Sequence, residues 1–290
     1  MPSESLYPLN KITYKRSLPV RIAKVVLAVA NRGLPKGLYT ILYDSGRSLL
    51  WTVQRVLLKA RLFAAVILHK ENVGKLRLVD KLLPFTMGGP LALSATFDVV
   101  NIAEKNGVRG ALVECGVGKG GCGAMMALVS KELGSKKTLW LCDSYEGLPE
   151  PTEKDFRDVK AGEMIGPLSQ GMLAHPEEQV SDLIFNKCRL LKEDVKIVKG
   201  WFQDTLPAVR KDMGVIAVLR LDGDWYESTK CCLENLYDSV SPKGFVIIDD
   251  YATCYGAERA VTEFLLARRI KVEFIPDGRG GVWFRKPANA

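Results

Sequence analysis

Histidine is scarce in this sequence, which holds only His69 and His175 among its 290 residues. A Ser-His-Asp triad needs a positioned imidazole, and a His-rich metal site needs several, so the scarcity argues against both. His175 lies before a Pro-Glu-Glu run, where a role as a catalytic base competes with a packing role near a helix start. The chemistry is therefore expected to rest on other side chains.

Disulfide, zinc and membrane-spanning signals are also lacking. The seven cysteines are odd in number, and none of them is paired at zinc-ligand spacing. The N-terminus has no early apolar segment followed by a small-residue cleavage site. No run of 18 uncharged apolar residues exists, since Arg55, Lys59 and Arg61 interrupt the best candidate. We therefore expect a cytoplasmic protein without a membrane span.

Positive charge is concentrated in the first part of the chain. Residues 1–82 hold 15 of the 41 Lys and Arg residues but 4 of the 33 Asp and Glu residues, a charge of +11, whereas the remainder carries −3. Segments 18–30 and 47–70 mix apolar and basic residues and indicate helices. We therefore expect a basic helical N-terminal extension over residues 1–82.

Two interpretations of this extension stay open. It is either a helical cap through which copies of the chain self-associate, or a segment that contacts an anionic surface. The anionic surface would be the inner face of a membrane or an acidic substrate. No nucleic-acid partner is expected, because the remainder of the chain is net negative and shows no aromatic-basic motif.

From about residue 83 short apolar runs alternate with helix-length segments. Continuous apolar strands between helices are typical of a mostly parallel sheet covered on both faces. The last two strands flank a short Gly-rich turn and are expected to be antiparallel. We predict an α/β, Rossmann-like domain over residues 83–290, with strands at 110–116, 137–143, 195–200, 215–222, 244–250, 270–275 and 281–285.

Two features near the first strands suit a nucleoside ligand. A Gly-rich turn at 116–121 joins a strand to a helix, and its glycines allow a ligand to approach the backbone closely. Its spacing is not that of a phosphate-binding P-loop. Asp143 ends the next strand, where a carboxylate commonly accepts the two hydroxyls of a ribose. The alternatives are an ordinary tight turn and a solvated aspartate.

Aspartates end two later strands, at Asp222 and at Asp249–Asp250. Carboxylates that converge at one sheet edge repel unless a cation lies among them, and oxygen ligands suit Mg²⁺ or Ca²⁺. Neighbouring residues of a strand point to opposite faces, so Asp249 and Asp250 reach one ion only if the chain turns there. Otherwise one of them caps the next helix or turn. Asp224 is assigned to the turn.

Several motifs in the same order resemble the macrocin O-methyltransferase family, the metal-dependent sugar O-methyltransferases of macrolide and aminocoumarin biosynthesis. The similarity covers about residues 85–285. The segments that carry it are Phe85-Thr86-Met87, VECGVGKGG (113–121), CDSYEGLPEP (142–151), GWFQDTLP (200–207), LRLDGDWYEST (219–229), LENLYDSVSPKGFVIIDDY (233–251) and GVWFRK (281–286).

The resemblance implies a class I methyltransferase fold and two bound groups, S-adenosylmethionine and Mg²⁺. It places the cofactor's methionine part against Glu114, Gly116, Gly118 and Gly120, under Thr86 and Met87, its ribose at Asp143 and Ser144, and its adenine at Gly200, Trp201 and Phe202. It assigns Mg²⁺ to Asp222, Asp249 and Asp250, with Asp222 as the catalytic base. The implied reaction is methylation of a hydroxyl of a sugar or glycosylated small molecule.

The sequence also departs from the family pattern. Gly118-Lys119 stands where the family has a Trp-Arg pair, and the family's substrate-lid region, 150–188, matches poorly. Other acceptors therefore remain alternatives: a catechol-like compound, or a lipid-linked or cell-surface glycan held near a membrane by the basic extension. A further alternative is a protein that binds S-adenosylmethionine without turnover, although a retained carboxylate cluster argues against it.

Overall fold

The computed structural model describes residues 35–68, 70, 72–157 and 168–288. The expected helix at 18–30 lies outside them. The chain divides into two compact units, Met1–Gln54 and Arg55–Ala290, and the sheet with all its strand ends belongs to the second. The boundary expected at residues 82–83 stays a prediction.

The helices vary widely in length. Residues 47–67 of the segment 47–70 expected to be helical belong to a longer helix, α2, which begins at Lys36, continues through Gly46 and ends at Ile67. The helices of the described residues are α2 (Lys36–Ile67), α3 (Val73–Leu82), α4 (Gly89–Lys105), α5 (Gly121–Glu132), α6 (Glu177–Ser181), α7 (Phe202–Met213), α8 (Tyr226–Leu236) and α9 (Tyr255–Ala267). Among the described residues, no helix has both the length and the apolar composition needed to cross a bilayer.

One seven-stranded sheet organises the second unit, in the order β3-β2-β1-β4-β5-β7-β6. Strands β1 to β5 are parallel, and β7 is antiparallel to both β5 and β6. This confirms the predicted α/β fold with its antiparallel end. The strands are β1 (Ala111–Cys115), β2 (Leu139–Asp143), β3 (Val195–Lys199), β4 (Ile216–Leu221), β5 (Val240–Ile248), β6 (Ile275–Pro276) and β7 (Val282–Arg285).

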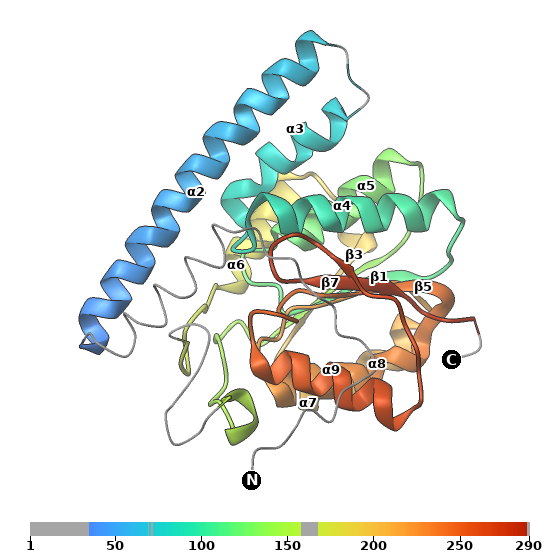
Figure 1. The fold of residues 1–290 in the computed structure, drawn as a ribbon. Helices are drawn as coiled ribbons and strands as arrows, with labels where there is room; N and C mark the ends of the chain where they lie inside the picture. The colour runs from blue at the N-terminus through green and yellow to red at the C-terminus, as the bar shows by residue number, and fades with distance from the viewer. Residues whose placement is uncertain (1–34, 69, 71, 158–167, 289–290) are drawn as a thin grey trace. The chain divides into compact units, whose positions relative to one another are not determined.

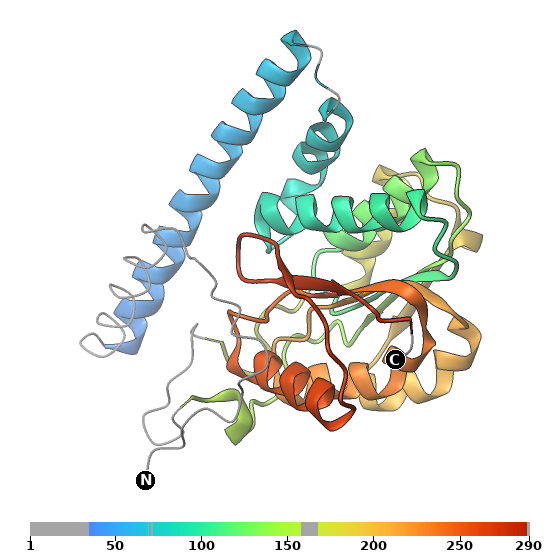
Figure 2. The same cartoon turned by 45° about the vertical axis from the view of Figure 1, so that its right-hand side comes forward.

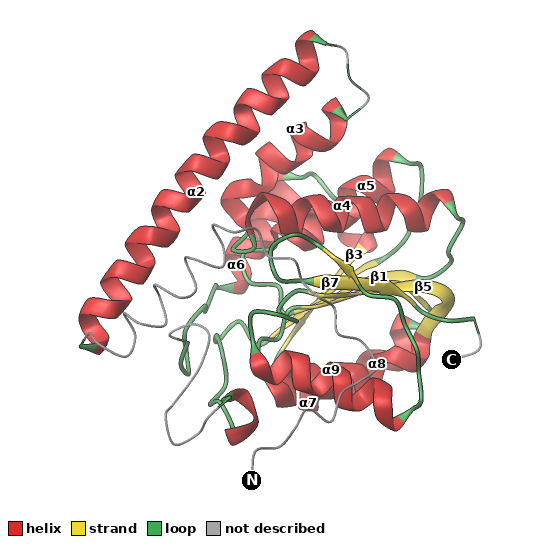
Figure 3. Cartoon of the chain, viewed as in Figure 1, coloured by secondary structure: helices red, strands yellow, loops and turns green. Residues whose placement is uncertain are grey.

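Helices cover both faces of the sheet. Figures 1 and 3 show α4 and α5 on one face and α7, α8 and α9 on the other, and the rotated view in Figure 2 agrees. Every residue of β1 and β4 is buried, as the continuous apolar strands predicted. Two of these buried residues are charged rather than apolar, Glu114 in β1 and Arg220 in β4. Buried charge of this kind indicates a site.

The prediction of a strand over 270–275 is largely wrong. Only Ile275 and Pro276 pair with β7, and the four residues before them form no ladder. Pro276 has no backbone N–H to donate. The preceding Phe274 packs against Tyr251 and Phe284, with ring centroids 4.9 and 5.5 Å away. Aromatic packing, rather than strand pairing, holds this segment.

Candidate active site

The carboxyl ends of β1, β2, β4 and β5 meet at one edge, where the strand order reverses between β1 and β4. Ligands of open α/β sheets bind at such a reversal. Gly116, directly after β1, lies against the turn that follows β4: a Cβ at Gly116 would stand 1.8 Å from the carbonyl oxygen of Asp222. Its φ of 86° also favours glycine. The turn after β1 and the turn after β4 are therefore in direct contact.

The Gly-rich turn leads into α5 through two more glycines of positive φ. At Gly118 (φ 52°) no heavy atom lies within 4 Å of a would-be Cβ, so this part of the turn borders open space. Gly120 faces Val180 and Leu183, which lie within the poorly matching region 150–188. The amide groups of the first turn of α5, which lack a side-chain cap, lie directly after this open edge.

The segment of Thr86 and Met87 packs against the same helix start. A Cβ at Gly121 would lie 2.4 Å from the carbonyl oxygen of Phe85 and 3.2 Å from Cβ of Thr86. The hydroxyl of Thr86, a buried residue, accepts a hydrogen bond from the amide of Gly88 at 3.1 Å. Sequence positions more than 30 residues apart thus form one wall beside the Gly-rich turn.

Asp143 fixes the Gly-rich turn. Its Oδ2 accepts hydrogen bonds from the amides of Val117 (2.6 Å) and Gly118 (3.1 Å), and its Oδ1 accepts one from the amide of Tyr145 (2.7 Å). A carboxylate has about four acceptor positions, and three are in use here. The ribose role remains a prediction, in which a diol would share this carboxylate with the turn.

Ser144 and the residues around Gly200 adjoin Asp143. The hydroxyl of Ser144 donates to the carbonyl of Gly147 at 3.2 Å, which shapes the next turn. The amide of Gly200 donates to the carbonyl of Asp143 at 2.9 Å, and Trp201 then caps α7. Phe202 lies 3.6 Å from a would-be Cβ of Gly223, so the residues expected at the adenine border the turn after β4.

Three aspartates come together at the ends of β4 and β5. Carboxylate oxygens of Asp222, Asp249 and Asp250 all lie within 4.8 Å of one another. Because β5 ends at Ile248 and the chain turns at once, the two neighbouring aspartates reach the same point. Asp249 and Asp250 are buried, whereas the side chain of Asp222 is 31% exposed. Asp224, assigned to the turn by sequence, joins Asp250 and Cys254 in a second group.

Two arginines neutralise part of this charge, and the sequence interpretation missed both. The guanidinium of Arg220 donates to Glu114 (3.1 Å), to Asp222 (2.8 Å) and to Asp249. Arg279, from the last turn, also pairs with Asp249. Arg220 and Asp222 are two residues apart at the end of β4, and such residues point to the same face of a strand. This spacing is the sequence signal that could have placed Arg220 beside the aspartates. No comparable signal marks Arg279.

Burial sets the protonation of most carboxyls in this cluster. It raises the pKa of Glu114 to about 8, although the charge of Arg220 works in the opposite direction. Burial, together with the neighbouring Asp249, also raises the pKa of Asp222, and burial raises that of Asp250. Within the described residues, one buried oxygen of Glu114 and one of Asp250 have no hydrogen-bond partner. Such oxygens are suited to a cationic ligand.

Asp249 behaves in the opposite way. Burial alone would raise its pKa, but Arg279 and Arg220 together hold the pKa below its usual range. The cluster therefore holds one firmly ionised carboxylate between two arginines. Around it lie carboxyls whose pKa values are raised by burial.

His175 is the residue for which the sequence leaves a catalytic-base role and a packing role open. Its Nε2 lies 3.2 Å from the sulfur of Met87, and burial with the charge of Lys119 lowers its pKa, against the influence of Asp143. It thus lies beside the Gly-rich turn rather than apart from it. By contrast, Trp225 is buried and donates its indole N–H to the carbonyl of Pro149 at 3.1 Å, which is a packing role.

Comparisons with known proteins agree with this arrangement. The macrocin-O-methyltransferase (TylF) family profile matches residues 57–286. Demethyldecarbamoylnovobiocin O-methyltransferase of Streptomyces niveus is 40% identical over 62% of this chain and 68% of its own length. The 8-demethyl-8-(2,3-dimethoxy-alpha-L-rhamnosyl)-tetracenomycin-C 4'-O-methyltransferase of Streptomyces olivaceus is 44% identical over 58% of this chain and 62% of its own length.

A solved structure, that of the O-methyltransferase NovP, is 36% identical and covers 70% of this chain and 82% of its own, with a TM-score of 0.62. The profile match starts inside α2, before the region that the motifs cover, and continues to the end of β7. With the fold, the order of the motifs and the profile in agreement, the chain belongs to the macrocin O-methyltransferase family and is an O-methyltransferase.

Proposed function

We propose that this enzyme transfers the methyl group of S-adenosylmethionine to a hydroxyl of a sugar or glycosylated small molecule, with Mg²⁺ held by Asp222, Asp249 and Asp250. The two relatives above are named for acting on demethyldecarbamoylnovobiocin and on a tetracenomycin that carries a rhamnosyl group. The observation that carries the proposal is the convergence of these three carboxylates within 4.8 Å.

The donor set fits a hard divalent cation. All the groups are carboxylate oxygens, and one oxygen of Asp250 is buried without a partner in the described residues. The carboxyls of this cluster outnumber its two arginines, Arg220 and Arg279, so the cluster gains net negative charge when the carboxyls lose their protons to bind a metal. Mg²⁺ prefers such ligands and keeps waters in its remaining positions. When bound, it lowers the pKa of a coordinated hydroxyl.

The cofactor's ammonium group has a matching partner in the free buried oxygen of Glu114. Its other parts fit the open edge at Gly118 and the backbone around Asp143 and Gly200. The sulfonium methyl is already electrophilic. The residues of this chain therefore have to hold donor and acceptor in line rather than activate the donor, a contribution that proximity makes large.

Asp222 is the proposed base. It is the most exposed of the three aspartates, and its raised pKa means that it can take up a proton. The N–H of Arg220 holds one of its oxygens at 2.8 Å and so fixes the direction in which the other points. A general base must lie within hydrogen-bond reach of the proton that it removes. The side chain of Asp222 is 31% exposed, so an acceptor hydroxyl can approach it.

The test combines metal binding with turnover. We expect Asp250→Asn to weaken Mg²⁺ binding, measured by calorimetry, by more than about 100-fold, because even outer-shell metal partners are worth about 10–100-fold. Transfer of methyl groups to an aryl rhamnoside should fall in parallel, while S-adenosylmethionine binding should persist. Asp238→Asn, on an exposed surface residue, is the matched control.

Full turnover of Asp250→Asn, or wild-type turnover unaffected by chelators, would show that the enzyme needs no metal. If the enzyme methylated catechol but no rhamnoside, its acceptor would be a catechol-like compound rather than a sugar.

A further inference from the structure

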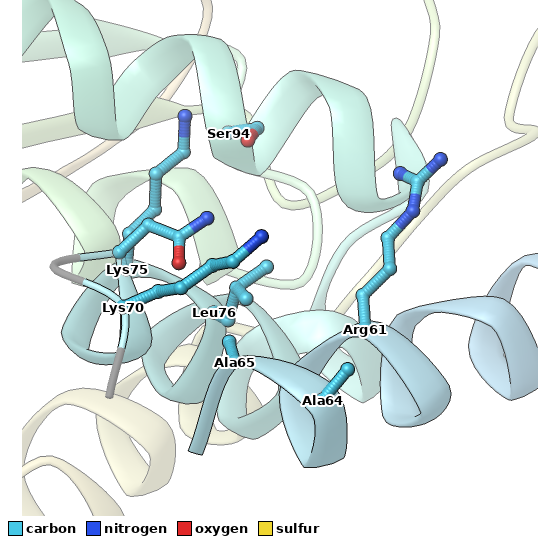
Figure 4. A pocket seen from close by; sticks show the side chains of 8 residues that line it. Arg61, Ala64, Ala65, Lys70, Lys75, Leu76 and Ser94 are labelled. Carbon is cyan, nitrogen blue, oxygen red and sulfur yellow. The ribbon is translucent and has the colours of Figure 1, made fainter. Parts of the chain in front are cut away.

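A second pocket lies far along the chain from the strand ends. It is formed by the last turns of α2, the start of α3 and the middle of α4, all within the unit Arg55–Ala290, and has a volume of about 450 Å³. Figure 4 shows Lys70 and Lys75 on one side and Arg61 on the other, above the apolar Ala64, Ala65 and Leu76. Among the described residues, no carboxylate lines it.

Within the part of the chain that the structure describes, two of the three basic side chains that line this pocket have no acidic partner. Lys75 pairs with Asp98 at 2.6 Å. Arg61 and Lys70 form no ion pair with any described residue, and both are exposed. Asn72 and Ser94 add polar groups at the rim. An anion with several oxygen acceptors, such as a phosphate group, is the ligand that such a set would attract.

Exposed apolar side chains lie on the same turns of α2 as the pocket-lining Arg61, Ala64 and Ala65. Phe63 is 69% exposed, and large apolar residues on both sides of it are 40–63% exposed. They are Val56, Leu57, Val66, Ile67 and Leu68. The inner face of the same turns is different, because Leu58 and Ala65 are buried. A contiguous exposed apolar face indicates a binding surface. We call it, with Arg61, Lys70 and Lys75, the α2–α3 surface.

We propose that the α2–α3 surface docks on an anionic lipid bilayer and that its pocket receives a lipid phosphate. Charge selects this occupant over a second copy of the chain. Residues 55–82 hold seven basic and two acidic residues, so two such surfaces would repel each other. A bilayer offers both phosphates and an apolar layer beneath them, which matches basic side chains interspersed with exposed apolar ones. This proposal does not depend on the acceptor or on the metal.

Vesicle flotation of the full chain tests the proposal. We expect binding to phosphatidylcholine vesicles that contain phosphatidylglycerol, weak binding to phosphatidylcholine alone, and loss of binding as NaCl rises. The pair Arg61→Glu and Lys70→Glu should lower the vesicle affinity at least about 10-fold, since each basic residue near an anionic surface contributes about 1 kcal/mol. Phe63→Ser should also lower it, by removing apolar contact.

The matched control reverses two exposed lysines elsewhere, Lys211→Glu and Lys271→Glu, and should keep most of the affinity. The milder pair Arg61→Gln and Lys70→Gln, checked by thermal melting, separates loss of docking from loss of folding. Absence of wild-type flotation on anionic vesicles would overturn the proposal, and so would equal losses in both charge-reversed pairs. A dimer in solution that Phe63→Ser converts to a monomer, without flotation, would assign the surface to self-association instead.

Discussion

The strand-end cluster and the α2–α3 surface use charged residues in opposite ways. At the strand ends the arginines are turned inward, and Arg220 is 2% exposed with three carboxylate partners. On the α2–α3 surface Arg61 and Lys70 have no acidic partner among the described residues and lie beside exposed apolar groups. The comparison teaches that internal pairing marks charges that organise a site. Charges left unpaired in a pocket point to a partner outside the chain.

The largest effect should come from removing the internal counterion. Arg220→Ala should reduce the free energy of unfolding by about 3–5 kcal/mol, because it leaves buried carboxylates without their partner. Arg268→Ala breaks a surface pair with Asp238 and should change it by about 0–1 kcal/mol. Denaturant titration of both variants measures the contrast. Equal losses of unfolding free energy would mean that the buried pairs of Arg220 stabilise the fold no more than the surface pair of Arg268 does.

A second effect concerns pH. The pKa of Glu114 is about 8 in the folded chain, above its ordinary 4.5. The folded state therefore keeps a proton that the unfolded state loses. This contribution to stability is complete below pH 4.5 and disappears as the pH rises towards 8. Between pH 5 and 8, without ligands, the wild type should lose roughly 3 kcal/mol more than Glu114→Gln, at about 1.4 kcal/mol per pKa unit.

Denaturant titrations at both pH values measure this difference. An identical pH dependence of the wild type and Glu114→Gln would show that Glu114 is already ionised at neutral pH.

A smaller effect is expected where two segments meet beside the Gly-rich turn. His175→Ala removes the contact with Met87 and should raise the dissociation constant of S-adenosylmethionine about 2–10-fold, within the range of pairwise couplings. Met87→Leu should have a similar effect, and the double variant should lose little more. Calorimetry on the four proteins measures the coupling, and fully additive losses would contradict it.

The smallest effect should lie on the α2–α3 surface. Arg61→Ala and Lys70→Ala should each change the free energy of unfolding by no more than about 0.5 kcal/mol, as expected for exposed residues without internal partners. A loss above about 1 kcal/mol would give these side chains a role inside the fold, and the contrast between the two regions would disappear.

Much of the fold was accessible from sequence because periodicity and glycine positions are local signals. The buried strands and the antiparallel end of the sheet follow from them, whereas the segment before Ile275 does not. Its alternating pattern predicts a strand, but Phe274 packs against aromatic rings contributed by distant positions.

The candidate site divides in the same way. Aspartates at strand ends are visible in the sequence. The turn that brings Asp249 and Asp250 to one point depends on where the ladder of β5 stops, and no residue pattern fixes that. Arg279 and His175 reach the site from segments far along the chain. Their roles arise from tertiary contacts, which a single sequence does not encode locally.

Arg220 contacts both halves of the proposed site: Glu114, proposed to face the methyl donor, and Asp222 and Asp249, proposed to face the acceptor. A ligand that draws Glu114 away from this guanidinium leaves more of its charge to the two aspartates. A ligand that neutralises the aspartates does the reverse. By reciprocity, each binding event must change the affinity of the other by the same factor. Under the proposed assignment, the shared arginine would couple the binding of donor and acceptor, with a sign that the order of addition cannot alter.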